Sequence, residues 1–336
     1  MKLPDSPVLS LSDYSTKDTK WDTDRAMADR ISKIYAGDDM FVRRAERMCR
    51  CSERLLFAQK YSRDTGELKL ALRNGNFCHT PFCPVCGRRR SLRWIRRLWE
   101  ALPKLLEERP AARWLFLTLT LRNPPVDKTR DTLKLMNAAW QRLIKRKEFA
   151  PVLGWLRSTE ITYGEVPGCS HPHFHVMLMV PPSWFTRNYV KQTRWIELWR
   201  ECLRVDYDPN VDIRVVKPKK RVPDGATLAD VHRISMESAV IETLKYTVKA
   251  SEIVKDPAWF LELARQTYGM RMIASGGVLK GVLQEEKPET DEDLIMADEP
   301  AELDEFEELA FWLAFDWERG IRKYRRNQDA DFKADG

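Results

Sequence analysis

One ten-residue stretch, His171 to Val180, restricts the fold more than any other part of the sequence. It reads His-Pro-His-Phe-His-Val-Met-Leu-Met-Val and is followed by two prolines. Its apolar composition and its length predict a buried strand. Side chains alternate along a strand, so His173 and His175 should share one face. Two adjacent imidazoles on a rigid strand favour a divalent-metal site, although backbone carbonyls could also satisfy both rings.

A carboxylate is predicted to join these histidines. Residues 154–164 read as a second strand, which is separated from the first by a turn containing Pro167-Gly168. The resulting hairpin would bring Glu160 beside His173 and His175. A strand glutamate is costly to bury unless it is paired or bound to metal, so we predict that these three residues hold a cation. His171 is the alternative third ligand.

The cysteines predict a second metal site. Five of the seven lie between residues 41 and 90, and Cys83-Pro-Val-Cys86 has the spacing of a zinc knuckle. No βαβ pattern surrounds it, which disfavours a redox role. Cys78 is a natural third ligand, Cys51 or Cys49 the fourth, and His79 a competitor. We predict structural Zn²⁺ on a set of four, with a metal-free cluster as the alternative. The set is Cys51, Cys78, Cys83 and Cys86.

The charge distribution favours a polyanionic partner. Residues 285–308 contain thirteen acidic residues and one lysine, whereas the whole chain has a formal net charge of +7. The rest of the chain therefore carries +19, which suggests nucleic acid. A solvated basic surface is the simpler alternative.

Two basic stretches are candidates for contacting DNA phosphates. Residues 87–102 predict an amphipathic helix with an arginine-rich outer face, and residues 217–221 read Lys-Pro-Lys-Lys-Arg. The predicted contacts are Arg89, Arg93, Arg96, Lys217, Lys219 and Lys220.

The sequence indicates a soluble protein. No run of about 18 apolar residues occurs, and the N-terminus has no basic-then-apolar signal. We therefore expect a cytoplasmic protein with no membrane partner. The odd cysteine count argues against a disulfide scaffold.

The remaining patterns define the expected elements. We predict a flexible lead over residues 1–40 with a weak helix at 24–36, and an acidic linker over 285–308 that precedes a terminal helix. In the helix expected over 235–254, Glu242, Tyr246 and Lys249 fall on one side. Further expected elements are strands over 114–121 and 212–216, and helices over 128–147, 183–204 and 311–326.

Taken together, three motifs resemble those of the rolling-circle replication initiators of small bacterial plasmids, a branch of the HUH endonucleases. Phe116-Leu-Thr-Leu-Thr-Leu121 is similar to the first motif strand. His171-Pro-His-Phe-His175 is similar to the histidine motif, and Glu242-Thr-Leu-Lys-Tyr246 to the motif with one tyrosine and a preceding glutamate. The cysteine cluster ahead of the first motif is also a feature of that branch. The resemblance spans about residues 45–285.

The resemblance implies an α+β fold of the ferredoxin-like type, with a central antiparallel sheet and flanking helices, beside a small zinc module. Together with the composition of the two ends, which lie outside the resemblance, this gives four expected regions: a flexible lead (1–40), a Cys-rich and basic region (41–110), an endonuclease domain (111–284) and an acidic linker with a C-terminal helix (285–336).

The implied reaction is origin-specific nicking of one DNA strand. Tyr246 would attack the scissile phosphate beside Mg²⁺ or Mn²⁺, form a 5′-phosphotyrosine and leave a 3′-hydroxyl primer for a host polymerase and helicase. Lys245 or Lys249 would help the tyrosine to ionise, and Glu242 would activate water to end the round.

The sequence is also compatible with three other interpretations of its function. A transposase or relaxase could use the same chemistry. A zinc-containing DNA-binding regulator would need no catalytic tyrosine, and the basic charge alone also allows RNA binding.

Overall fold

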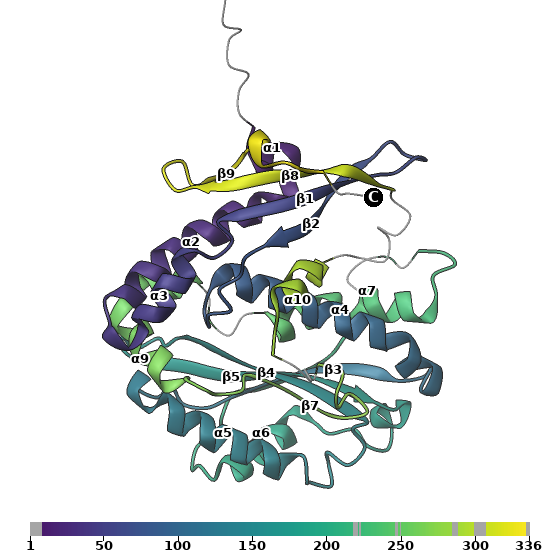
Figure 1. Ribbon diagram of the computed structural model, residues 1–336. Coiled ribbons are helices and arrows are strands. Elements are labelled where there is room, and N and C mark those ends of the chain that lie inside the picture. Colours follow the sequence, from purple (N-terminus) through teal and green to yellow (C-terminus); the bar gives the residue numbers. More distant parts are fainter. Residues whose placement is uncertain are drawn as a thin grey trace, which may run out of the picture. The chain divides into compact units, whose positions relative to one another are not determined.

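Two antiparallel sheets flanked by helices account for the described part of the computed structural model (Figure 1), which covers residues 9–217, 221, 223–245, 248, 250–283, 288–298 and 307–333. The chain divides into two units, residues 1–96 with 287–336, and residues 97–286. The predicted α+β class with antiparallel sheets and flanking helices is therefore confirmed.

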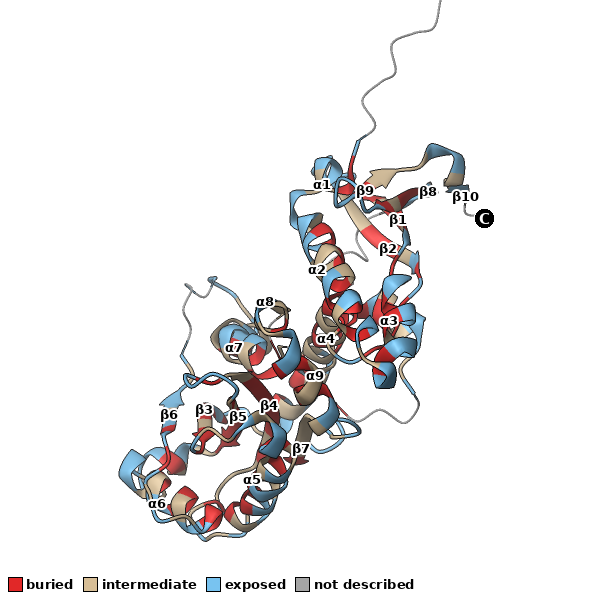
Figure 2. Ribbon diagram, turned by 90° about the vertical axis from the view of Figure 1, so that its left-hand side faces the viewer, coloured by how far each residue is buried: buried red, intermediate tan, exposed pale blue. Residues whose placement is uncertain are grey.

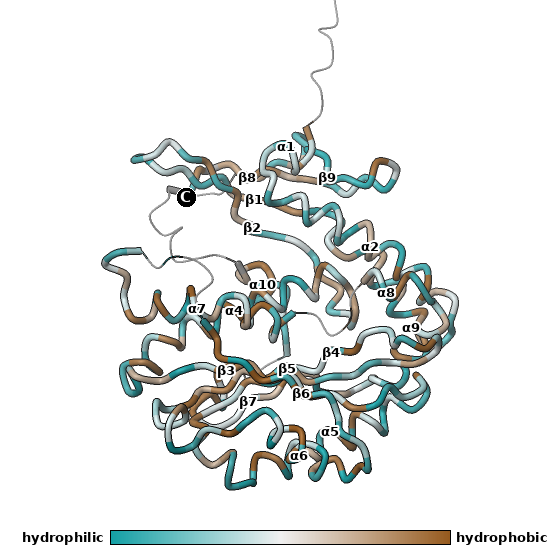
Figure 3. The backbone as a smooth tube through the Cα atoms, turned by 180° about the vertical axis from the view of Figure 1, so that it is seen from behind, coloured by the Kyte–Doolittle hydropathy of each residue, from teal (hydrophilic) through white to brown (hydrophobic). Residues whose placement is uncertain are grey.

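The sheet of the second unit has the strand order β6-β3-β5-β4-β7, and every neighbouring pair is antiparallel. Its strands are β3 (Arg113–Thr120), β4 (Gly154–Tyr163), β5 (Ser170–Val180), β6 (Val211–Val215) and β7 (Ile273–Gly277). The central strands β3, β5 and β4 are mostly buried (Figure 2). The hydrophobic colouring along β3 in Figure 3 agrees with that burial.

Helices cover both faces of this sheet. Helices α5 (Thr129–Leu143) and α6 (Gln192–Leu203) pack together on the face that Phe174 occupies, since Trp140 and Trp199 contact that ring. Helix α7 (Leu228–Leu244) contacts β4 and β5 on the histidine face, as Glu242 shows by its approach to His175. Short helices complete the unit: η3 (Val126–Lys128), η4 (Pro182–Phe185), α8 (Ala250–Lys255) and α9 (Pro257–Gln266).

The first unit begins with helices that the sequence did not predict in full. These are α1 (Leu11–Tyr14), α2 (Thr19–Ala36) and α3 (Val42–Cys49). Trp21, Ile31 and Tyr35 of α2 are buried. Residues 9–36 are therefore folded, with the apolar side of α2 packed into a core, and the expectation of a flexible lead is wrong for them. Helix α4 (Pro84–Glu108) starts in this unit and continues into the second.

The sheet of the first unit joins the two ends of the chain. Strand β1 (Arg54–Tyr61) lies between β2 (Leu68–Gly75) and β8 (Glu307–Glu318), and β8 also pairs with β9 (Lys323–Arg326) and β10 (Phe332–Lys333). The predicted helix over 311–326 is wrong. Leu313, Phe315 and Trp317 are all buried and occupy every second position. This spacing is the two-residue period of a strand.

The acidic segment also departs from the prediction of a solvated linker. Residues 288–298 contain helix α10 (Asp291–Ile295), whose Leu294 is fully buried. The remaining short helices are η1 (Thr16–Asp18), η2 (Asp39–Phe41), η5 (Met296–Asp298) and η7 (Gln328–Ala330).

The helix predicted over 235–254 is interrupted. Helix α7 ends at Leu244, Lys245 has an extended backbone, and α8 starts at Ala250. Tyr246 and Lys249 lie outside the described residues. Within the described part of the chain, no helix is both long and apolar enough to span a membrane.

Candidate functional site

The β4–β5 hairpin brings a carboxylate and two imidazoles together on one face of the second sheet. Glu160 lies directly opposite His173, and Ser158 opposite His175, in the antiparallel register. Residues opposite each other on neighbouring strands project to the same face, so Glu160 joins the two histidines. The hairpin and this juxtaposition are as the sequence predicted.

The three side chains form a tight, buried cluster. His173 Nε2 and His175 Nε2 each lie 2.9 Å from Glu160 Oε2. All three residues are at least 93% buried, and Glu160 Oε1 has no hydrogen-bond partner among the described residues. Two imidazole nitrogens and a carboxylate, one oxygen of which is otherwise unsatisfied, are a donor set that fits a divalent cation.

Hydrogen bonds at the far ring nitrogens orient both imidazoles. His173 Nδ1 donates to the His171 carbonyl oxygen at 3.2 Å, and His175 Nδ1 lies 3.4 Å from Thr118 Oγ1. Both Nε2 atoms therefore face the cluster. Burial lowers the pKa of His175, which favours the neutral ring that a metal requires. The sequence placed Thr118 in a strand but did not assign it this contact.

Lys245 and Glu242 extend the cluster toward solvent. Lys245 Nζ lies 2.8 Å from Glu160 Oε2 and 2.7 Å from Glu242 Oε1, and Glu242 Oε1 is 3.5 Å from His175 Nε2. Burial raises the pKa of Glu160, but hydrogen bonds from both histidines and Lys245 outweigh it and hold the pKa well below its usual range. Burial lowers the pKa of Lys245, but its carboxylate partners outweigh this and raise it. Glu160 and Lys245 are therefore both charged at neutral pH.

His171, the alternative third ligand, is placed differently. Its Nδ1 lies 2.5 Å from Asn123 Oδ1, and the residue is only partly buried. Burial and the neighbouring His173 lower its pKa. It lies outside the group whose ligand atoms converge, which consists of Glu160, His173 and His175.

The chain on both sides of Tyr246 is attached to β4. On the upstream side, Lys245 bonds Glu160. On the downstream side, Glu252 of α8 accepts a hydrogen bond from the Tyr163 backbone N–H at 3.0 Å. The Tyr163 hydroxyl lies 3.0 Å from Asp256 Oδ2, which fastens α9 to the same strand end. The sequence carried no signal for these bonds, because they join residues about 90 positions apart.

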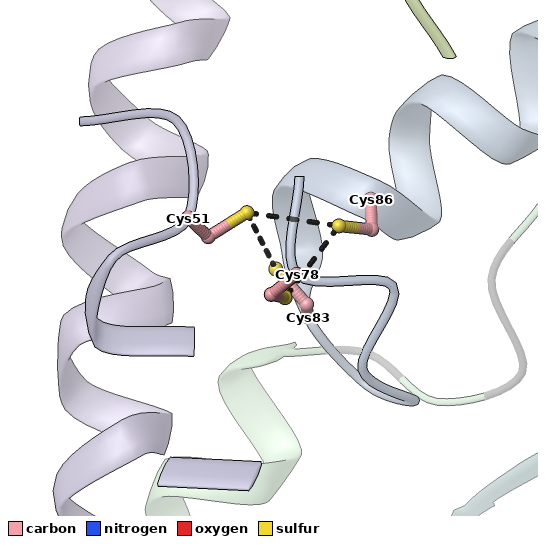
Figure 4. A group of neighbouring side chains, drawn as sticks. All are labelled: Cys51, Cys78, Cys83 and Cys86. Carbon is pink, nitrogen blue, oxygen red and sulfur yellow. Dashed lines mark hydrogen bonds between the residues drawn. The ribbon is translucent and has the colours of Figure 1, made fainter. Parts of the chain in front are cut away.

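The four predicted zinc cysteines converge in the first unit (Figure 4). Cys51 Sγ and Cys78 Sγ each lie 3.6 Å from Cys86 Sγ, and Cys83 Sγ lies 3.7 Å from Cys51 Sγ. Four sulfurs around Zn²⁺ at about 2.3 Å have edges of about 3.8 Å, so these distances fit a tetrahedral site. Burial raises the pKa of the Cys83 thiol, and a bound cation would oppose that effect.

The two rival zinc ligands are occupied elsewhere or exposed. Cys49 is exposed and outside the cluster. His79 bonds two carboxylates of the acidic segment, with Nδ1 2.9 Å from Glu289 Oε1 and Nε2 2.7 Å from Asp291 Oδ1. Within the described residues, Cys51 is therefore the fourth member of the cluster.

The arginines of α4 do not form the exposed face that the sequence predicted. Arg89 is fully buried and donates to the carbonyl oxygens of Leu294 and Ile295 at 2.7 Å. Arg93 is buried and pairs with Asp293 at 2.9 Å. Arg96 donates to the Met296 carbonyl at 2.6 Å. These three side chains hold residues 293–296 against α4.

The predicted basic loop is described only in part. Lys217 is exposed, whereas Lys219 and Lys220 lie outside the described residues.

Comparison with known proteins identifies relatives over most of the chain. The family model described as "Replication protein" matches residues 69–325. A "Protein rep" of Bacillus amyloliquefaciens is 34% identical over 312 residues, which are 89% of this chain and 88% of that protein. A "Protein rep" of Streptococcus pneumoniae serotype 2 is 30% identical over 271 residues, or 79% of each chain. A "Protein rep" of Bacillus sp is 36% identical over 226 residues, which are 67% of this chain and 71% of that protein. No solved structure matches this chain significantly.

Proposed function

This chain belongs to the Replication protein family, and we propose that it initiates rolling-circle replication of a plasmid by nicking one strand of the origin. Three of its features support this reaction. They are the buried Glu160 cluster, the tyrosine beside Lys245, and the order of the three motifs along the chain.

His173, His175 and Glu160 would hold one Mg²⁺ or Mn²⁺, which when bound polarises the scissile phosphate. Thr118 and the His171 carbonyl contact the Nδ1 atoms of the two imidazoles, so both rings already present Nε2 toward a cation at Glu160. The Glu160 carboxylate supplies the negative charge of the set.

Tyr246 is the proposed nucleophile. Its phenolic oxygen attacks the phosphorus, the bond from phosphorus to the 3′-oxygen breaks, and that oxygen leaves as a 3′-hydroxyl after taking up a proton. The product is a 5′-phosphotyrosine, which conserves the phosphodiester energy for rejoining. A phenol has a pKa near 10, so a nearby positive charge favours its ionisation. Lys245 and Lys249 would provide that charge.

One observation carries the assignment of Tyr246. Lys245, the residue before it, has its Nζ 2.8 Å from Glu160 Oε2, so the side chain adjacent to the tyrosine in sequence contacts a proposed metal ligand. Consecutive Cα atoms are about 3.8 Å apart. Glu252 fastens the chain six residues after Tyr246 to the same strand, β4.

Glu242 is the proposed general base for the final hydrolysis. Its carboxylate is 3.5 Å from His175 Nε2, and its side chain is 40% exposed, so a water molecule can reach it from solvent. Removing a proton from that water would let hydroxide release the 5′ end from Tyr246 and stop a second round.

Contacts to the DNA duplex would come from the basic loop rather than from α4. Lys217 is exposed, and we propose that it acts with Lys219 and Lys220. Arg93 and Arg96 would reach phosphates only if residues 293–296 moved away, and the buried Arg89 supports the fold instead. The 3′-hydroxyl would then prime a host polymerase behind a host helicase.

The test is a nicking assay on supercoiled plasmid that carries the cognate origin, with Mg²⁺ or Mn²⁺. Wild type should give an open circle with protein on the 5′ end, and Tyr246→Phe should give none. Tyr189→Phe is the matched control, because Tyr189 is a strongly exposed tyrosine that no proposed step uses. Full nicking by Tyr246→Phe would refute the proposal, and origin binding without nicking would favour a non-catalytic regulator. Failure to support a mini-plasmid, despite nicking, would favour a transposase.

A further inference from the structure

The loop that follows β3 runs along the edge of the metal centre. Thr120, the last residue of β3, pairs directly with His173, and its N–H and hydroxyl both bond the Asn210 carbonyl. The loop after Thr120 therefore leaves the sheet beside the histidines, next to the chain that leads into β6.

Arg122 in this loop is held by Tyr207. The Arg122 backbone N–H donates to the Tyr207 hydroxyl at 2.9 Å, and the guanidinium carbon lies 4.4 Å from the centre of the Tyr207 ring. One side chain thus fixes both the backbone and the cationic group of Arg122. A stacked guanidinium loses less freedom on binding than a free lysine would, because it is already oriented.

The guanidinium still has unused donors. Arg122 is exposed, and no carboxylate of the described residues lies within 4.0 Å of it. Asp208, which follows Tyr207 in the sequence, pairs with Arg200, with 2.7 Å between Asp208 Oδ1 and Arg200 Nη1. An arginine that is oriented, exposed and unpaired is suited to bind a phosphate with its planar fork of N–H groups.

The same loop is hydrogen-bonded to His171, whose carbonyl in turn contacts the ring of His173. Asn123 Oδ1 lies 2.5 Å from His171 Nδ1, and the His171 carbonyl accepts from His173 Nδ1 at 3.2 Å. Paired Cα atoms are about 5 Å apart and two further residues add at most about 7 Å, so the Cα of Arg122 lies within about 12 Å of that of His173. The long arginine side chain can therefore reach a nucleotide close to the scissile one.

We propose that Arg122, supported by Tyr207, binds a backbone phosphate of the single strand that enters the metal centre. This inference rests on the proposed nicking function, since it names a further DNA contact of the same site. The contact reads no base, so it should be independent of sequence and sensitive to salt.

The experiment measures binding of fluorescent single-stranded (dT)20 to the full, zinc-loaded chain across a salt series with Mn²⁺ present. Arg122→Ala should weaken binding about tenfold at 50 mM salt, the scale of a lost charged hydrogen bond. The fall of log K with log salt should also become shallower, its slope decreasing in magnitude by about 0.7. Tyr207→Phe, which keeps the ring and removes the hydroxyl acceptor, should show a smaller loss.

Arg187→Ala is the matched control. Arg187 is exposed, and it follows the C-terminal end of β5, about 23 Å along the strand from His173. It should leave affinity and slope close to the wild-type values. Equal losses in Arg187→Ala and Arg122→Ala would mean a general charge effect and would overturn the inference.

Two further results would also overturn it. If Arg122→Ala bound (dT)20 as tightly as the wild type, Arg122 would not contact the strand. This conclusion would hold even if Tyr246→Phe had abolished nicking. Loss of Mn²⁺ affinity together with DNA affinity would mean that the substitution disturbs the loop and, through Asn123 and His171, the metal site. The proposed function stands or falls separately, on the nicking assay.

Discussion

Glu160 is the single anionic member of the converging triad, so replacing Glu160 with glutamine isolates its charge while keeping its shape. The substituted side chain would retain a carbonyl oxygen near His173 and His175 but would lose the negative charge that both Nε2 atoms approach at 2.9 Å. We expect Glu160→Gln to weaken Mn²⁺ binding and to leave the hairpin intact.

The size of the effect follows from the position of the carboxylate. Losing a group that merely orients a metal ligand costs about 10- to 100-fold in affinity. We propose Glu160 as a direct ligand, so Glu160→Gln should lose at least about 100-fold in Mn²⁺ affinity, which corresponds to about 2.7 kcal/mol. Lys245 reduces the difference in Mn²⁺ affinity between wild type and Glu160→Gln, because in the wild type the cation must displace the lysine ammonium from Glu160.

The assay is a calorimetric Mn²⁺ titration of the full chain, loaded with zinc so that the cysteine cluster is filled. Glu242→Gln is the matched control, since Glu242 Oε1 is 3.5 Å from His175 Nε2 and its side chain is 40% exposed. Glu242 is not one of the three converging ligands, so Glu242→Gln should lose clearly less Mn²⁺ affinity than Glu160→Gln. Unchanged affinity in Glu160→Gln, or an equal loss in Glu242→Gln, would refute the assigned triad.

Further predictions concern the first unit. Cys83→Ser should lose the bound zinc and destabilise the unit, whereas the exposed Cys49→Ser should keep the metal, and elemental analysis of the two purified variants checks both. Glu289→Gln should lower the free energy of unfolding by about 3 kcal/mol in denaturant titrations, because a carboxylate whose side chain is only 11% exposed, and which bonds Arg90 at 2.6 and 2.7 Å, is lost. The exposed Glu318→Gln should cost under about 1 kcal/mol, and equal costs would contradict the argument. Burial raises the pKa of Glu289, but Arg90 and His79 outweigh it and the net pKa is lowered. Its stabilisation should therefore be present above pH about 4.3 and be lost as pH falls further, so wild type and Glu289→Gln should converge in acid.

The candidate metal centre could be predicted because its signal is local. The alternation of the His171 to Val180 strand and the short turn before it determine which residues lie opposite each other. Once the hairpin is assumed, Glu160 must lie beside His173. The cysteine spacing is informative in the same way, since Cys83-Pro-Val-Cys86 brings two thiolates to one ion.

The first sheet could not be predicted because its partners are far apart in the chain. Strand β8 pairs with β1 about 260 positions earlier, as in Leu55 opposite Phe315. Residues 311–317 are too uniformly apolar for periodicity to separate a helix from a strand. Their conformation is set by β1, which the sequence pattern did not reveal.

The roles of the α4 arginines could not be predicted for a related reason. A helix with Arg89, Arg93 and Arg96 reads as a basic surface when it is considered alone. In the structure, residues 293–296 supply a carboxylate and main-chain carbonyls for those guanidinium groups. Local charge patterns do not reveal such partners, because nothing in either segment specifies the other.

The central claim is that Tyr246 becomes covalently linked to DNA. The most direct measurement is mass spectrometry of the protein after reaction with supercoiled origin plasmid and Mn²⁺, followed by nuclease and trypsin digestion. Trypsin cuts after Lys245 and Lys249, so it releases the peptide Tyr246-Thr-Val-Lys249. We expect a nucleotide phosphate on Tyr246 in this peptide and no adduct in Tyr246→Phe. An adduct on any other residue, or nicked plasmid with no adduct at all, would contradict this expectation.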